Sequence, residues 1–161
     1  MAITPEEIAR EKKRLPRGWG RFGKSLERLA EISGPDETLL SSCVGLNPSF
    51  EHKPSGVAVA GRVPVGMLAG GLYEMTKTTN AVLAITNERL ILVGTGFGGA
   101  PRDHGVIPLE GLEIASQAKQ EFVIRWPEGQ MRIRGAAKQQ VPDFLNTLAA
   151  QARPPRPEAK D

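Results

Sequence analysis

The chain has 161 residues, of which 40% are hydrophobic and 24% charged, the composition of an ordinary soluble protein with one domain. Its net charge is only +3, and aromatic residues make up 5%, which argues against a surface built for stacking bases. Cys43 is the single cysteine, so an intrachain disulfide is excluded, and its position in an apolar run suits a reducing compartment.

Residues 1–38 are predicted to form a basic helical extension. Thr4 is placed as the N-cap of a first helix, because Pro5 follows at the first helical position and Glu7 completes a capping box. This helix should run to about Arg14. Apolar residues at helical spacing then predict a second short amphipathic helix, which stops at Gly34-Pro35.

The segment from Arg10 to Arg28 holds eight basic and two acidic residues, a net charge of +6. It can rest on an anionic membrane or an acidic partner, attract nucleic acid, or form a solvated helix pair packed on the rest of the protein. No base-reading motif accompanies it. The candidate anion, lipid or partner contacts in this segment are Lys12, Lys13, Arg14, Arg17, Trp19, Arg21 and Lys24.

A first strand is predicted over 39–46, followed by a glycine-rich insertion over 47–79. The insertion opens with a polar loop through His52 and becomes apolar, and we expect extended or irregular structure there. Arg62 and Pro64 interrupt the apolar stretch, which excludes a membrane span. Its apolar residues either join the core or contact a partner, a second copy of the chain included; the candidates are Met67, Leu68, Leu72, Tyr73 and Met75.

Two β-rich runs, 81–85 and 89–93, flank a short polar break and predict a buried hairpin. The glycines of 94–99 have the spacing of a dinucleotide-binding loop. However, the residues that follow, 100–105, cannot open the helix that would hold a pyrophosphate. We therefore expect a hairpin loop there and no nucleotide.

The next predicted strand runs from Val106 to Ala118 with an interruption near Gly111. A second hairpin follows, since apolar residues alternate over 122–126 and over 131–133 around the turn 127–129.

Facing the apolar side of this second hairpin inward places Trp126 opposite Met131, and hence Arg125 opposite Arg132, with Arg134 nearby. Like charges facing each other on a sheet are mildly destabilising, so a carboxylate such as Glu113 or an external anion should lie between them. These three arginines are therefore candidate anion-binding residues.

An amphipathic helix is predicted near the C-terminus, with Pro142 in its first turn and an apolar face of Val141, Phe144, Leu145, Leu148 and Ala149. Residues 153–161 are rich in proline and charge, and they are predicted to be a disordered tail. The fold class expected is mainly β, a bent antiparallel sheet or partial barrel of about half a dozen strands. The C-terminal helix should cap it, and one or two helices should precede it.

The run from Leu83 to Val93, LAITNERLILV, resembles the hairpin signature of bacterial pleckstrin-homology-like domains, which are related to GRAM domains. Two further features agree with this resemblance. One is Ile107-Pro108-Leu109 followed by Leu112-Glu113-Ile114, and the other is a last hairpin that leads into a closing helix. The resemblance covers 39–152, apart from the 47–79 insertion. It implies a non-catalytic scaffold for contact with lipid or protein.

No catalytic residue, metal ligand set or cofactor site is predicted. His52 and His104 are expected in loops and Cys43 in a strand, so no nucleophile–base pair can be assembled. The predicted function is a cytoplasmic, non-catalytic binding or adaptor module that contacts a protein partner or, peripherally, an anionic membrane surface. A nucleic-acid-associated accessory protein that uses the basic N-terminal segment is the alternative.

Overall fold

The computed structural model describes residues 2–46, 48–52, 80–96 and 100–154. The insertion residues 53–79, with Met67, Leu68, Leu72, Tyr73 and Met75, lie outside the described residues. The described elements are α1 (Pro5–Lys13), η1 (Gly20–Phe22), α2 (Gly23–Ile32), β1 (Leu39–Leu46), β2 (Ser49–His52), β3 (Asn80–Thr86), β4 (Arg89–Thr95), β5 (Pro101–Pro108), β6 (Glu113–Gln117), β7 (Phe122–Trp126), β8 (Gly129–Ile133), β9 (Gly135–Ala136) and α5 (Val141–Gln151).

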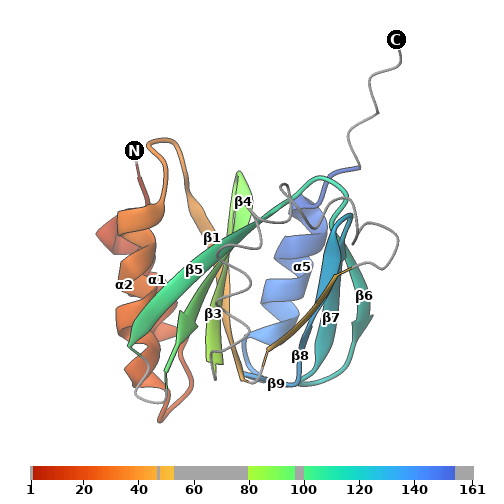
Figure 1. Cartoon of the computed structure of the whole chain (residues 1–161). Coiled ribbons are helices and arrows are strands. Elements are labelled where there is room, and N and C mark those ends of the chain that lie inside the picture. The colour runs from red at the N-terminus through yellow and green to blue at the C-terminus, as the bar shows by residue number, and fades with distance from the viewer. Residues whose placement is uncertain (1, 47, 53–79, 97–99, 155–161) are drawn as a thin grey trace.

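The strands form two antiparallel sheets, and the predicted mainly β fold with flanking helices is confirmed. The first sheet has the order β5-β4-β3-β1-β9 and the second the order β2-β8-β7-β6. In Figure 1 the helix pair α1 and α2 covers one face of the first sheet, and α5 lies between that sheet and the second one. The sheets bend around α5 and do not close into a barrel.

The β3–β4 hairpin lies at the centre of the first sheet and is buried on both faces. Leu83 and Ile85 face α5 and the second sheet, whereas Val82 and Ala84 face the helix pair. A strand buried on both sides needs apolar residues at every position rather than at alternate ones. This double burial is the reason that the hairpin appears in the sequence as two unbroken apolar runs.

The N-terminal helices begin and end close to the predicted positions. The capping box is formed: the Thr4 side chain accepts a hydrogen bond from the Glu7 N–H, and the Glu7 carboxylate accepts one from the Thr4 N–H at 2.8 Å. Ile3 and Ile8 are both buried in the core shared with the first sheet. The helix pair is therefore a packed layer of the fold, as one of the sequence-based alternatives predicted.

The turn of the β3–β4 hairpin is held by a buried carboxylate. Glu37, which is 2% exposed, accepts hydrogen bonds from Arg89 at 2.8 and 2.9 Å, from the Thr86 hydroxyl at 2.7 Å and from the Gly34 N–H at 2.7 Å. Burial alone would raise the pKa of Glu37, but the hydrogen bonds from Arg89, Gly34 and Thr86 and the charge of Arg89 lower it below its ordinary value. This interaction fastens the hairpin to the α2–β1 connection.

The C-terminal helix fills the space between the two sheets. Phe144 and Leu148 are fully buried, and the ring of Phe144 lies 5.8 Å from that of Phe122 between centroids. Ala149, which the sequence pattern placed on the apolar face, is exposed. Beside the helix, a side chain at Gly45 would bring its Cβ within 2.6 Å of Ile133, so glycine allows the first sheet to approach the second there.

Three strand predictions were wrong. Ser49–His52 forms β2, paired with β8, where a polar loop was expected. The single strand predicted over 106–118 is two strands in different sheets, because the chain turns at Gly111, whose φ of 76° favours glycine. With the short strand β9, which was not predicted either, the described strands number nine rather than about six.

The predicted register of the β7–β8 hairpin was also wrong, by two residues. Trp126 pairs with Gly129 and Arg125 with Gln130, so Arg132 faces Val123 instead of Arg125. A shift of two leaves every side chain on its own face, and the inward–outward pattern therefore cannot distinguish the two registers. The turn decides, since Pro127 and Glu128 alone connect the strands.

Arg153 was predicted to begin a disordered tail, but it is bound to the protein. Its N–H donates to the Leu109 carbonyl at 3.0 Å and its carbonyl accepts from the Gly111 N–H at 2.8 Å. Residues 155–161 lie outside the described residues.

Candidate functional site

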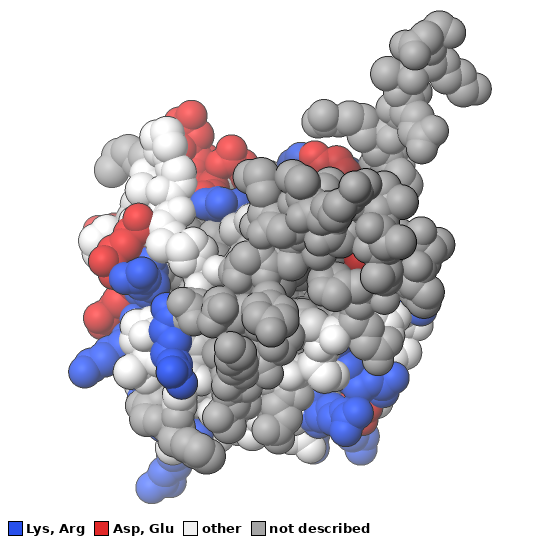
Figure 2. Space-filling view, in the orientation of Figure 1, with Lys and Arg blue, Asp and Glu red and all other residues white. Residues whose placement is uncertain are grey.

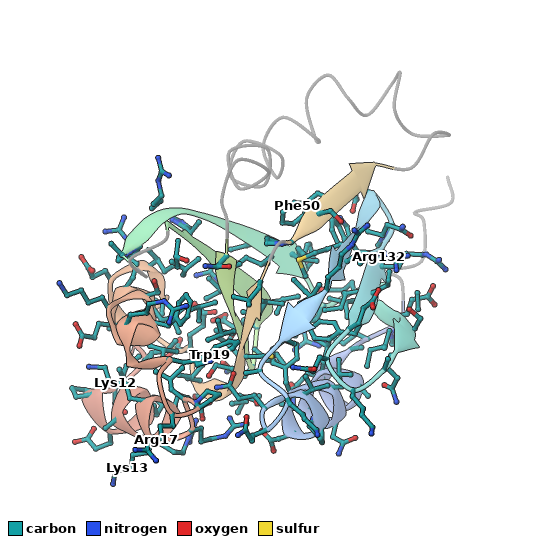
Figure 3. All side chains as sticks on the ribbon, turned by 90° about the horizontal axis from the view of Figure 1, so that it is seen from below. Lys12, Lys13, Arg17, Trp19, Phe50 and Arg132 are labelled. Atoms are coloured by element: carbon teal, nitrogen blue, oxygen red, sulfur yellow. The ribbon has the colours of Figure 1, made fainter. Side chains whose placement is uncertain are left out.

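The basic residues selected from the sequence lie on two separate surfaces. In Figure 3, Lys12, Lys13 and Arg17 are on the helix pair, on the opposite side of the molecule from Arg132. The structure does not bring the predicted contacts together, and they cannot form one binding site.

Most of the selected residues on the helix pair have internal partners. Arg14 contacts Glu11 at 2.5 Å and Asp143 of α5 at 3.1 Å, and Lys12 pairs with Glu27. Glu11 is 1% exposed, so its pairing with Arg14 is structural.

The two selected residues near Phe22 also have structural contacts. Trp19 is half-buried against Phe22, with the ring centroids 5.9 Å apart, and the Arg21 guanidinium lies 4.5 Å above the Phe22 ring. Three exposed cations of the set, Lys13, Arg17 and Lys24, have no carboxylate partner among the residues that the structure describes.

The arginines of the second sheet are paired within the protein as well. Arg125 contacts Glu113 of β6 at 3.3 Å, the partner proposed from the sequence, and Arg132 contacts Glu121 at 3.0 Å. Only Arg134 of these three is exposed without a described carboxylate partner. The face predicted to attract an external anion is thus largely neutralised by its neighbours.

The groups considered for catalysis, Cys43, His52 and His104, all lie in strands. Burial raises the pKa of Cys43 to about 12, which keeps the thiol protonated at neutral pH. His52 and His104 lie in β2 and β5 and not in loops, contrary to prediction. Over the described ranges, His, Cys, Asp and Glu nowhere gather in a group of three or more that could hold a metal. Nor is any helix of those ranges long and apolar enough to cross a membrane.

A groove of about 430 Å³ lies between the end of β6 and the first half of α5. Val141, Pro142 and Leu145 of α5 form its apolar side, and the β6–β7 turn forms the other. The sequence pattern does not reveal this groove, because its two sides come from segments separated by nineteen or more residues, and the pattern does not give the distance between them in space. Its described lining residues are Gln117, Ala118, Lys119, Lys138, Val141, Pro142, Leu145 and Asn146.

The strand beside the groove, β6, is an edge of the second sheet. It pairs with β7 on one side, and no described residue pairs with its other side. After Glu113 the run Ile114-Ala115-Ser116-Gln117 is neutral and contains no proline. The strand contains a β-bulge at Ala115, and bulges are frequent at sheet edges and near functional sites.

The other three sheet edges are less open. Pro101 and Pro108 stand at the two ends of β5, and proline protects an edge because it offers no N–H. β9 and β2 are short, with two and four residues, and shortness also protects an edge. Among the described strands, β6 is therefore the edge best suited to accept a further strand.

The main chain of Gln117 points away from β7. The Ala118 N–H donates to the Glu121 carbonyl at 2.7 Å, which makes this the hydrogen-bonded pair nearest the turn. Bonded and non-bonded pairs alternate along an antiparallel ladder, so the next pair, Gln117 with Phe122, is non-bonded. The N–H and C=O of Gln117 are consequently available to a strand laid along β6.

Basic side chains gather near this end of the second sheet. Figure 2 shows Lys and Arg over the lower right of the molecule, where the second sheet ends. By chain position this end carries Lys119 in the β6–β7 turn and Arg132 and Arg134 at the end of β8.

Comparison of the chain with protein-family models, with curated proteins and with solved structures finds no match.

Proposed function

We propose that this protein is a non-catalytic binding module that takes up an extended segment of a protein partner along the outer edge of β6, against α5. The observation that carries the proposal is the neutral, proline-free edge strand beside an apolar groove of about 430 Å³. The resemblance to pleckstrin-homology-like domains, which implies a scaffold rather than an enzyme, points the same way.

Strand addition uses both parts of this site. The main-chain groups of the edge strand supply hydrogen bonds that do not depend on sequence, and a pocket for alternate side chains supplies specificity. Gln117 offers the main-chain groups. The exposed Pro142 and Ala118, together with the small exposed parts of Val141 and Leu145, offer a limited apolar surface for an inward-facing side chain of the partner.

The substitution Gln117→Pro tests this proposal. It removes the outward N–H and leaves the β6–β7 ladder intact, because that N–H does not bond to β7. We expect peptides selected on the immobilised full-length protein from a random display library to bind the variant at least about 10-fold more weakly by calorimetry.

Gln117→Ala is the matched control, because it removes the same side chain but keeps the N–H, so the affinity lost by Gln117→Pro beyond that lost by Gln117→Ala is due to the N–H. Circular dichroism confirms that both variants fold. Undiminished binding to Gln117→Pro would refute strand addition at β6. A selection that recovers no peptide above the display background would count equally against it.

A second function is suggested by three cations of the helix pair that have no carboxylate partner in the described part of the chain. Lys13, Arg17 and Lys24 are exposed, and near an anionic surface each contributes about 1 kcal/mol. We propose that this surface rests on anionic lipid. A variant with alanine at Lys13, Arg17 and Lys24 should therefore lose most of its co-sedimentation with phosphatidylserine vesicles at low salt.

The control is the double variant Arg125→Gln with Arg132→Gln, because these arginines are paired within the protein. Its co-sedimentation with the vesicles should change little. Stronger binding to duplex DNA than to vesicles would favour the nucleic-acid alternative instead.

A further inference from the structure

The groove beside β6 has a positively charged end, and this end indicates the chemistry of the partner. We infer that the segment bound along β6 is acidic, with carboxylate side chains at the end that lies beside the β6–β7 turn. The inference rests on the proposed strand addition and specifies which kind of segment is added.

The positive charge comes from two lysines on opposite sides of the groove. Lys119 is in the β6–β7 turn and Lys138 lies in the connection that leads into α5, and both line the groove. The two segments are fastened together: the Ala136 N–H donates to the Gln120 carbonyl at 2.8 Å, and the Gln120 side-chain amide donates to the Ala136 carbonyl at 3.5 Å. The backbone that carries both ammonium groups is thus held in place before any partner arrives.

These two charges are not neutralised by the described protein. None of the described lining residues is acidic, and neither lysine has a carboxylate partner among them. The carboxylates nearest in sequence are already engaged, Glu121 by Arg132 at 3.0 Å and Asp143 by Arg14 at 3.1 Å and by the Ser41 hydroxyl at 2.7 Å. The lysines therefore differ from Arg125 and Arg132 of the second sheet, which have internal partners.

The occupant must satisfy three features of the site together. The open main-chain groups of Gln117 match a peptide backbone, the apolar lining around the exposed Pro142 matches an apolar side chain, and the two ammonium groups match negative charge. An extended protein segment with one or two apolar anchors and an adjoining run of Asp or Glu satisfies all three. A bilayer surface would leave the strand edge unpaired.

The experiment compares two display libraries that share a random, β-favouring centre and differ only in the flanks. The flanks are Asp and Glu in one library and Ser and Thr in the other. Peptides from each are measured by calorimetry against the full-length wild-type protein, against Gln117→Pro, and against Lys119→Glu combined with Lys138→Glu. We expect acidic-flank peptides to bind the wild type about 3- to 10-fold more tightly than neutral ones, which two exposed ion pairs can provide.

The double charge reversal should abolish this preference, and it should instead favour a third set of peptides with Lys flanks. Raising NaCl from about 0.05 M to about 0.5 M should remove the difference between the flanks in the wild type, because the pairs are exposed. The reversal also serves as its own folding control, since a misfolded protein would not gain affinity for Lys-flanked peptides.

The outcomes separate the inference from the function on which it rests. If neutral and acidic peptides bind equally and Gln117→Pro still weakens both, strand addition stands and the acidic partner is refuted. If acidic peptides bind Gln117→Pro as tightly as the wild type, both strand addition and the acidic partner at this site are refuted, because the peptides then bind somewhere other than the β6 edge. A preference that survives the double reversal refutes Lys119 and Lys138 as its source.

Discussion

Replacing Arg89 by methionine is expected to lower the free energy of unfolding by about 2–4 kcal/mol. The substitution preserves length and apolar packing but leaves Glu37, 2% exposed, without its countercharge. The cost is below that of a fully enclosed pair, because the Arg89 side chain is 31% exposed and because Glu37 keeps its hydrogen bonds from Gly34 and Thr86. Urea unfolding followed by circular dichroism measures the change.

Arg125→Met is the matched control for this prediction. It removes an arginine from a carboxylate pair that is exposed on both sides, 43% for Arg125 and 59% for Glu113, so we expect a change within about 1 kcal/mol. The double variant Glu37→Met with Arg89→Met should lose less free energy of unfolding than the sum of the losses of the two single variants, since no buried charge remains. Equal effects of Arg89→Met and Arg125→Met would contradict the structural role assigned to Glu37.

The lowered pKa of Glu37 gives the same interaction a pH dependence. Burial acts to raise this pKa, but the hydrogen bonds and charge of Arg89, with help from Gly34 and Thr86, outweigh it. A carboxyl whose pKa is lower in the folded state stabilises the protein above its unfolded-state pKa and loses that contribution as the pH falls through the folded value. The stability difference between wild type and Glu37→Gln should therefore be largest near neutral pH and shrink in acid.

The parts of the fold that the sequence predicted are those in which the chain has one dominant periodicity. The β3–β4 hairpin is buried on both faces, so its apolar runs have no competing interpretation. The capping box at Thr4 is likewise local, because all its atoms lie within four residues. The helix α5 was identified by Phe144, Leu145 and Leu148 at helical spacing.

The errors arose where the apolar pattern does not determine which strands pair or where they turn. A period of two fixes which face a side chain occupies but not its partner, so the β7–β8 register was wrong although Met131 and Ile133 were correctly placed inward. The separation of β5 from β6 depends on the turn at Gly111 and on which sheet each joins, and neither appears in the apolar pattern.

The candidate site was missed for a related reason. Its strand edge is visible in the sequence as the neutral, proline-free run Ile114 to Gln117, which could have been noted as an unprotected edge. That α5 lies alongside it follows only from the tertiary structure. Conversely, the sequence overstated the free positive charge, because two of the neutralising carboxylates, Asp143 beside Arg14 and Glu121 beside Arg132, lie in other parts of the fold.

Shortening Phe144 to alanine should destabilise the protein more than the loss of Arg89 does, lowering the free energy of unfolding by about 3–5 kcal/mol. The side chain is fully buried in the core shared by the first sheet, the second sheet and α5, and it contacts Phe122 of β7. Removing it opens a cavity between all three layers. Thermal and urea unfolding, recorded in parallel, measure the loss.

Because one core joins the two sheets, the Phe144→Ala variant should still unfold in a single transition with both probes, at lower temperature and lower denaturant concentration. Phe144→Leu should lose less free energy of unfolding, since most of the side-chain volume is kept. Asn146→Ala, on the exposed side of the same helix, should stay within about 0.5 kcal/mol of the wild-type stability. A loss at Phe144→Ala no larger than at Asn146→Ala would mean that α5 does not hold the sheets together. The groove assigned to partner binding would then lack its rigid wall.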